Sequence, residues 1–88
     1  MLILEELFRL DNKTIVITGA AGLLGKQHAE AIACYGGTPI LLDLSQEAVD
    51  DLANKLNEKY KVDTIGFAID ITDEQAIKKN TRLIIDKF

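Results

Sequence analysis

The chain alternates short, fully apolar runs with longer stretches in which apolar residues recur at helical spacing. The β-branched run at 13–18 stops abruptly at Gly19, which is typical of a buried parallel strand. A second apolar run ends at Asp43, and a third, over 62–69, ends at the following aspartate. Each of these runs predicts a β-strand.

The stretches between these runs predict helices. The first helix is expected over 23–35 and ends at two glycines, Gly36 and Gly37. The clearest helix follows Ser45, whose hydroxyl is suited to cap it. The predicted apolar stripe of the first helix is Leu24, Ala29, Ile32 and Tyr35. That of the second is Ala48, Val49, Leu52, Ala53, Leu56 and Tyr60.

A third helix is expected after the last strand. Thr72 and Gln75 have the spacing of a capping box, which marks a helix start. The apolar residues expected to be buried by this helix are Ile77, Ile84, Ile85 and Phe88. Residues 2–10 read as a short amphipathic lead-in that covers one edge of the domain.

The resulting order is strand, helix, strand, helix, strand, helix, with no linker-like segment and no repeat. Such alternation implies right-handed crossovers and a parallel sheet, so the fold class is α/β. Eighty-eight residues with 48% hydrophobic content describe one domain at most, over 1–88.

The charge of the chain restricts the classes of partner that it is expected to bind. The net charge of −4 and the lack of an arginine-rich run argue against nucleic acid and anionic membranes. Cys34 is the one cysteine, so no disulfide can form within the chain, which suits a reducing compartment. No apolar stretch approaches the ~20 residues that span a bilayer. We therefore expect a cytoplasmic protein.

A glycine-rich turn lies where the first strand meets the first helix. Gly19 suits a tight turn, Gly22 lets the backbone approach a pyrophosphate, and Gly25 lets the helix pack closely on the sheet. Free N–H groups near Leu23 and Leu24 would then face the anion, helped by the helix dipole. The whole turn reads Thr18-Gly19-Ala20-Ala21-Gly22-Leu23-Leu24-Gly25.

Two aspartates follow the second and third strands. Asp43, at the tip of the second strand, is expected to accept hydrogen bonds from an adenosine ribose. Asp70 lies on the same carboxyl edge and is expected to contact the adenine amino group. The competing interpretations are an ordinary turn aspartate for Asp43 and part of a helix start for Asp70.

Three other polar or reactive residues favour structural roles. His28 is interpreted as a half-buried packing residue of the first helix. Cys34 has no histidine or second cysteine at a useful spacing, so it reads as a small core residue or an idle thiol. Lys26 is interpreted as a solvated surface lysine rather than a phosphate contact.

With these residues in place, the sequence resembles the N-terminal part of a short-chain dehydrogenase/reductase. The resemblance covers roughly 10–88 and is carried by three motifs: the glycine-rich turn, Leu41-Leu42-Asp43-Leu44-Ser45, and Ala68-Ile69-Asp70-Ile71-Thr72-Asp73. It implies a three-layer half-Rossmann fold whose parallel three-stranded sheet has the order 3-2-1. It also implies a cofactor-binding set comprising Gly19, Ala21, Gly22, Leu23, Leu24, Gly25, Asp43, Leu44, Asp70 and Ile71.

The chain departs from the family pattern in two respects. Gly22 has the placement common in the family's extended subgroup. The length of the segment from Ser45 to Asp73, however, is similar to that in the short subgroup, so the sequence does not decide between the two subgroups. The family's catalytic tyrosine has a lysine four positions on, whereas Tyr35 is followed there by Pro39 and Tyr60 by Thr64. We expect a truncated cofactor-binding half that has no catalytic residue and no activity alone.

The resemblance implies that the parent moves a hydride between a nicotinamide cofactor and an alcohol or carbonyl. Asp43 favours NAD over NADP, because a 2′-phosphate would meet its carboxylate. The alternatives are an S-adenosylmethionine-dependent methyltransferase fragment and an interaction module that binds no nucleotide. The open side of the first strand also predicts a homo-oligomer, formed through that edge or the helices beside it.

Overall fold

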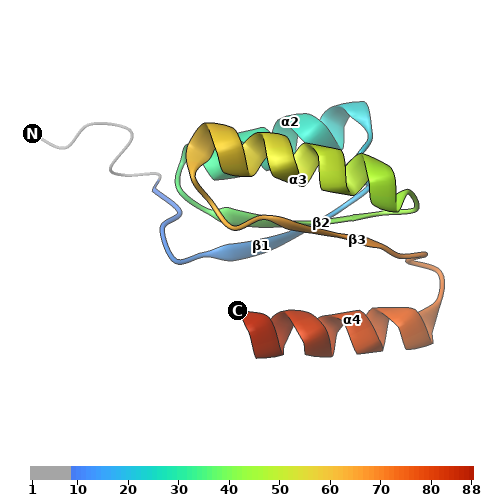
Figure 1. Cartoon of the computed structure of the whole chain (residues 1–88). Helices are drawn as coiled ribbons and strands as arrows, with labels where there is room; N and C mark the ends of the chain where they lie inside the picture. Colours follow the sequence, from blue (N-terminus) through green and yellow to red (C-terminus); the bar gives the residue numbers. More distant parts are fainter. Residues whose placement is uncertain (1–8) are drawn as a thin grey trace, which may run out of the picture.

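A computed structural model describes residues 9–88 of the chain. Within them, strands and helices alternate as the sequence pattern predicts (Figure 1). In chain order the elements are β1 (Thr14–Thr18), α2 (Leu23–Cys34), β2 (Thr38–Asp43), α3 (Gln46–Tyr60), β3 (Ile65–Ala68) and α4 (Glu74–Lys87). Residues 2–8 of the predicted lead-in lie outside the described residues.

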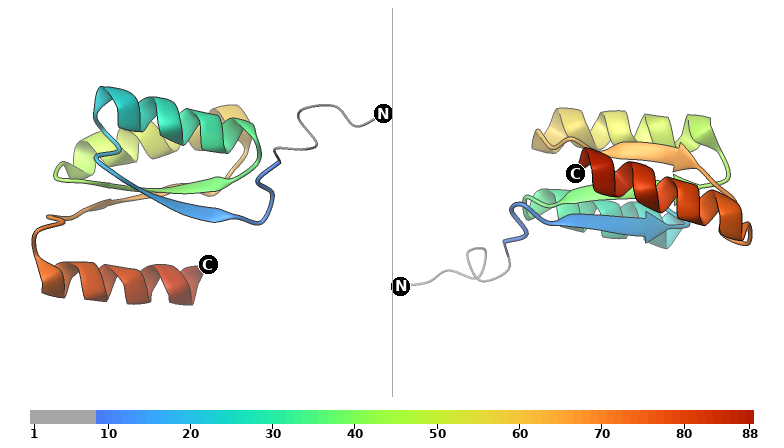
Figure 2. Two further views of the ribbon diagram at one scale, coloured as in Figure 1. Left: turned by 180° about the vertical axis from the view of Figure 1, so that it is seen from behind. Right: turned by 90° about the horizontal axis from the view of Figure 1, so that it is seen from below.

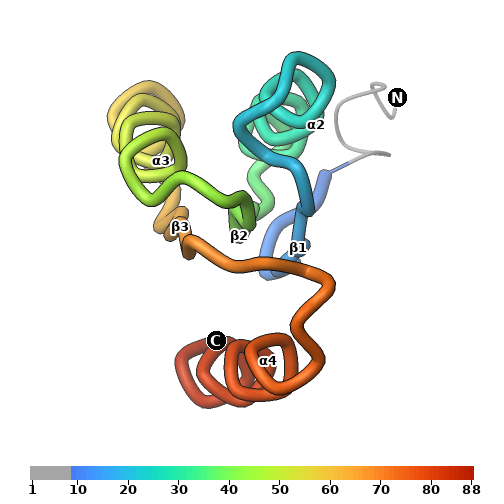
Figure 3. The backbone as a smooth tube through the Cα atoms, turned by 90° about the vertical axis from the view of Figure 1, so that its right-hand side faces the viewer, coloured from blue at the N-terminus to red at the C-terminus, as the bar shows by residue number. Residues whose placement is uncertain are grey.

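The three strands form one parallel sheet in the order β1-β2-β3, which is the predicted order 3-2-1 read from the other border. Thr14 pairs with Thr38 at one end of the first strand pair, and Asp43 pairs with Ala68 at the far end of the second. The end-on view shows α2 and α3 on one face and α4 on the other (Figure 3). The three-layer α/β prediction is therefore confirmed.

The face covered by α2 and α3 holds the larger core. Central β2 is apolar over most of its length, and its Ile40 and Leu41 are fully buried. Buried alanines on α2, Ala29 and Ala33, let that helix lie close to the sheet, while Val49 of α3 fills the space beside them. Because both helices pack against this face, it supplies most of the apolar burial that stabilises the fold.

Helix α3 forms as its sequence predicts. The hydroxyl of Ser45 accepts a hydrogen bond of 3.2 Å from the Ala48 N–H, which confirms the predicted N-cap. The helix ends at Lys61, which adopts the left-handed conformation that closes many helices. Val49, Ala53 and Leu56 of the predicted stripe are buried.

Helix α4 crosses the opposite face of the sheet (Figure 2) and differs from the prediction at two points. Its N-cap is Asp73 rather than Thr72, because the Asp73 carboxylate accepts the Ala76 N–H at 3.1 Å. Ile85 and Phe88, expected in the core, are 69% and 45% exposed. The helix faces the sheet through one side only, and the described residues supply no second layer to cover the other.

Helix α2 also departs from the prediction at its surface. Leu24, placed in the apolar stripe by its spacing, is 66% exposed, and His28 is exposed rather than half-buried. The residues that face the sheet are Gly25, Ala29 and Ala33. The contact face of α2 is therefore rotated from the one its larger apolar residues indicate, because small residues allow closer packing.

Candidate dinucleotide site at the carboxyl edge of the sheet

The turn between β1 and α2 is built around its three glycines. Gly19 has a φ of +64°, the left-handed region that glycine enters without strain, and its carbonyl accepts the Gly22 N–H at 3.0 Å. A Cβ on Gly25 would overlap the Gly19 carbonyl oxygen and lie 2.8 Å from the Ala20 Cα. The structure thus gives Gly19 the tight turn and Gly25 the close packing that the sequence predicts.

The N-terminus of α2 differs from those of the other two helices. It begins at Gly22, which has no side chain to cap it, and its first turn holds no acidic residue. Helices α3 and α4 are capped by side chains and carry Glu47 and Glu74 in their first turns. The first N–H groups of α2 and the positive end of its dipole therefore face solvent, which suits an anion.

Asp43 reaches from the end of β2 to this turn. One carboxylate oxygen, Oδ2, accepts the Ala21 N–H at 2.8 Å, and the other, Oδ1, accepts the Leu44 N–H at 2.7 Å. Two backbone donors from separate segments thus hold the carboxylate in one orientation. Each oxygen retains a lone pair that can accept a further hydrogen bond.

Asp70 is held in a comparable way at the end of β3. Its Oδ1 accepts the Thr72 hydroxyl at 2.6 Å and the Thr72 N–H at 2.9 Å. These two hydrogen bonds lower the pKa of Asp70 below its ordinary value. The carboxylate is therefore ionised at neutral pH and keeps its second oxygen for another donor.

A cavity of about 280 Å³ joins the two aspartates. It brings together five of the residues that the sequence predicts: Gly19, Asp43, Leu44, Asp70 and Ile71. Three further lining residues were not predicted: Leu42, Ile69 and Thr72. Leu42 and Ile69 each lie one position before a predicted aspartate, so their location at strand ends was the available signal.

The remaining predicted site residues lie in the turn itself. Ala21 is half-buried and bonded to Asp43, and Leu23 and Leu24 are 78% and 66% exposed at the start of α2. Leu44 and Ile71 are also exposed, at 74% and 56%. Four large apolar side chains thus surround this edge of the sheet, which is a common feature of ligand-binding surfaces.

The other reactive side chains lie away from this edge or make no site. Cys34 is an exposed free thiol near the end of α2, and His28 and Lys26 are exposed on the same helix. Within residues 9–88, no group of three or more His, Cys, Asp or Glu side chains has the arrangement of a metal site. The same residues include no helix long and apolar enough to cross a bilayer.

Comparison with known proteins identifies relatives of this arrangement. The short chain dehydrogenase family matches residues 13–88. Over 64 residues the chain is 36% identical to a very-long-chain 3-oxoacyl-CoA reductase of Bos taurus, an alignment that covers 73% of this chain and 20% of the relative. The chain thus spans about a fifth of that relative's length.

Solved structures show the same arrangement. The NAD⁺-bound xylitol dehydrogenase superposes with a TM-score of 0.83 at 26% identity, over 89% of this chain and 30% of that one. The L-sorbose reductase of Gluconobacter frateurii, complexed with NADPH and L-sorbose, superposes with a TM-score of 0.85 over 91% of this chain and 30% of that one. At 24% identity the second likeness establishes the fold alone.

Proposed function

The chain belongs to the short-chain dehydrogenase family, and we propose that its described residues bind the adenosine and pyrophosphate parts of NAD. The observation that carries this proposal is the arrangement of Asp43 beside the uncapped start of α2, at one cavity. A dinucleotide needs both a place for its anion and an acceptor for its ribose hydroxyls. These residues meet both requirements within one edge of the sheet.

The pyrophosphate is assigned to the first turn of α2. The N–H groups of Leu23 and Leu24 lack an acceptor one turn earlier in the helix, and Gly22 presents no side chain between them and a ligand. A Cβ at Gly22 would lie 3.3 Å from the Gly19 carbonyl oxygen, so the turn is already tight without one. Ala21 and Gly25 complete the backbone of this subsite.

The adenosine is assigned to the 280 Å³ cavity. Asp43 would accept hydrogen bonds from the ribose hydroxyls through the lone pairs that its two backbone donors leave open. Asp70 would accept one from the adenine amino group, since Thr72 occupies only its Oδ1. Leu44 and Ile71, both exposed beside the cavity, would cover the adenine faces.

The same geometry favours NAD over NADP. A 2′-phosphate about 4 Å from the Asp43 carboxylate would meet roughly 4 kcal/mol of repulsion at an effective dielectric of 20, before screening by salt. The carboxylate is held by Ala21 and Leu44, which opposes rotation away from the phosphate. No arginine lies near it in sequence, and the nearest downstream basic residue is Lys55.

Calorimetric titration with NAD and NADP tests these assignments. We expect the wild type to prefer NAD, and Asp43→Asn to narrow the difference between the two affinities. Asp51→Asn is the matched control, because Asp51 is an exposed aspartate on α3 away from the cavity. Equal affinities in the wild type would overturn the ribose assignment. Binding of S-adenosylmethionine alone would favour the methyltransferase alternative, and binding of neither ligand the interaction module.

A bound nicotinamide cofactor would supply or accept the hydride in the parent oxidoreductase, whose substrate is an alcohol or carbonyl compound. The 88 residues contain no tyrosine with a lysine four positions on, so they provide no general acid of that kind. Such a group contributes about 10²- to 10⁴-fold in rate. The chain should bind NAD without turning over carbonyl substrates. Steady NADH oxidation by the pure chain would contradict this.

Two further properties of the chain are proposed. The single cysteine and the acidic charge balance favour the cytoplasm, which fractionation of cells producing the chain would test. The open side of β1 favours self-association into a homo-oligomer, either through that edge or through adjacent helices.

A further inference from the structure

The cavity between the two aspartates is formed by loops that follow different strands. Asp43 and Leu44 lie at the end of β2, whereas Asp70 and Ile71 follow β3. The width of the cavity therefore depends on how the end of β3 is held beside β2. Because β3 pairs with a strand on only one side in the described sheet, hydrogen bonds along its other border also determine where this end lies.

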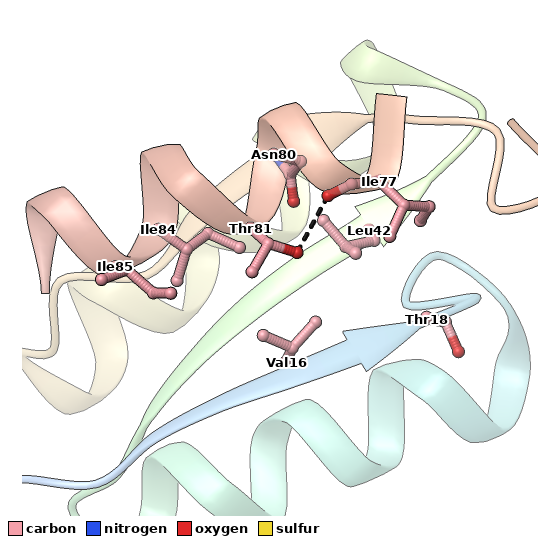
Figure 4. A pocket seen from close by; sticks show the side chains of 8 residues that line it. All are labelled: Val16, Thr18, Leu42, Ile77, Asn80, Thr81, Ile84 and Ile85. Atoms are coloured by element: carbon pink, nitrogen blue, oxygen red, sulfur yellow. Dashed lines mark hydrogen bonds between the residues drawn. The ribbon is translucent and has the colours of Figure 1, made fainter. Parts of the chain in front are cut away.

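On the side that faces β2, the end of β3 is held by its backbone and by apolar packing. The Ile69 N–H donates to the Asp43 carbonyl at 2.7 Å. The Ile69 side chain is 8% exposed and forms an apolar cluster with Leu42, against which Ile77 of α4 packs. Figure 4 shows Leu42 beside Ile77 on this face of the sheet. These contacts fix one side of the strand directly before Asp70.

On the opposite side, the end of β3 is held by Gln46, the first residue of α3. Its Oε1 accepts the Ala68 N–H at 2.9 Å, and its Nε2 donates to the Gly66 carbonyl at 3.0 Å. The same Nε2 donates to the Asp50 Oδ1 at 2.8 Å, one turn further along α3. Both amide hydrogens and the amide oxygen are thus used, which fixes the orientation of the carboxamide.

A glycine in β3 lets α3 lie close enough for these hydrogen bonds. A Cβ on Gly66 would lie 2.5 Å from the Cβ of Val49, which is three positions after Gln46. The first turn of α3 therefore lies directly against the backbone of β3. The same turn is capped by Ser45 and ends the loop that carries Asp43. Gln46 thus connects the two loops that form the cavity.

We propose that Gln46 is a positioning residue for the adenosine part of the dinucleotide, because through Ala68 it holds Asp70 in place relative to Asp43. This inference rests on the proposed function, which assigns adenosine to this cavity. The residues that line the cavity do not include Gln46, so it acts through β3 and not by contact with the ligand. Its hydrogen bonds go to α3 and β3, and none reaches the start of α2, where the pyrophosphate is assigned.

Asn57 offers a matched control, because it makes the same kind of contact at the other end of β3. Its carboxamide donates to the Thr64 carbonyl at 2.9 Å and accepts the Thr64 N–H at 2.7 Å. Thr64 is only 3% exposed and lies immediately before β3, at the end opposite to the cavity. If Gln46 served stability alone, changes at Asn57 and Gln46 would affect ligand binding alike.

Equilibrium dialysis of the whole chain with labelled AMP and with pyrophosphate, at low protein concentration, tests the proposal. We expect Gln46→Ala to weaken AMP binding by about three- to tenfold and to leave pyrophosphate binding unchanged. Asn57→Ala should destabilise the fold more and change neither affinity. Equal losses of AMP affinity in the two variants, or an unchanged affinity in Gln46→Ala, would overturn the positioning role.

A rescue variant separates the hydrogen bond to Ala68 from the other contacts of Gln46. Gln46→Glu keeps an oxygen for the Ala68 N–H, and Asp50→Asn in the same protein supplies an amide donor to the new carboxylate. Of the original hydrogen bonds, only the one to the Gly66 carbonyl lacks a replacement. We expect the double variant to recover most of the AMP affinity. An affinity as low as that of Gln46→Ala would overturn the role of the Ala68 bond.

Amide hydrogen exchange gives a measurement that needs no ligand. The N–H groups of Ile69 and Thr72 are both hydrogen-bonded at the end of β3 and report on its order. Gln46→Ala should accelerate their exchange more than Asn57→Ala does, although Asn57→Ala costs more stability. Unchanged exchange in Gln46→Ala would overturn the proposal. Accelerated exchange, together with a wild type that binds neither AMP nor NAD, would overturn the proposed function and retain the role of Gln46 in fixing β3.

Discussion

The two borders of the described sheet differ in the hydrogen bonding of their outward backbone groups. At β3, Gln46 and Asn57 bond to the outward backbone groups, and both side chains come from the helix that precedes the strand. At β1 the corresponding groups are open and an apolar groove lies beneath them. Two side chains of α3 thus protect one border of the described sheet, whereas no residue among 9–88 bonds to the outward backbone groups of the other.

The largest effect is expected from Asn57→Ala, which would leave the Thr64 N–H and C=O without partners. Thr64 is only 3% exposed, so water cannot readily replace the lost carboxamide. Each buried group left unsatisfied costs about 1–3 kcal/mol, and we expect a loss of about 2–4 kcal/mol in the free energy of unfolding. Urea denaturation measures it. Asn54→Ala, an exposed change on the same helix, should stay within about 0.5 kcal/mol of the wild type.

Gln46→Ala should have a smaller effect on stability and a visible effect on association. Of the two groups that it frees, the Gly66 carbonyl belongs to a buried residue and the Ala68 N–H to an exposed one, so we expect a loss of about 1–2 kcal/mol. The freed groups of β3 would then be open to pairing with a strand of another molecule, and light scattering should show larger species than the wild type forms. Gln75→Ala, an exposed glutamine on α4, should leave the size distribution unchanged.

The smallest effect concerns Glu30 of α2, whose side chain is hydrogen-bonded to two residues of α3. Its carboxylate accepts Lys59 at 2.9 Å and the Tyr60 hydroxyl at 2.8 Å, and these bonds, led by that from Lys59, lower the pKa of Glu30 below 4.5. Its contribution to stability is therefore present above the unfolded pKa and is lost as pH falls through the folded one. Glu30→Gln should flatten the pH dependence of stability below about pH 4.5. An unchanged pH profile would show that the exposed pair contributes nothing.

The strands and the clearest helix could be predicted because local signals fix them. The β-branched run before Gly19, the Ser45 cap and the stripe of α3 each depend on neighbours a few residues apart. The start of α4 was misplaced by one residue, since Thr72 fits the capping spacing but the carboxylate of Asp73 is the acceptor that caps the helix, at the Ala76 N–H. Competition between two nearby acceptors is not visible in a spacing rule.

Features that depend on distant contacts could not be predicted. Gln46 and Asn57 have the spacing of surface residues on a helix, and nothing in the sequence shows that their carboxamides bond to backbone groups of β3. Ile85 has core-like spacing in α4 but lies beside an open groove. In the candidate site, the two aspartates were identified by position, whereas the hydrogen bond from Ala21 to Asp43 became visible only in the folded chain.

That hydrogen bond makes any redesign of the proposed preference for NAD a problem with two parts. Removing the Asp43 carboxylate to admit a 2′-phosphate also removes the acceptor that holds the Ala21 N–H, and with it one constraint on the glycine turn. A redesign therefore has to retain a short acceptor at position 43, such as serine or asparagine, while adding positive charge at the exposed Leu44 position. Asp43→Ala combined with Leu44→Arg would add the positive charge but leave the Ala21 N–H without its acceptor.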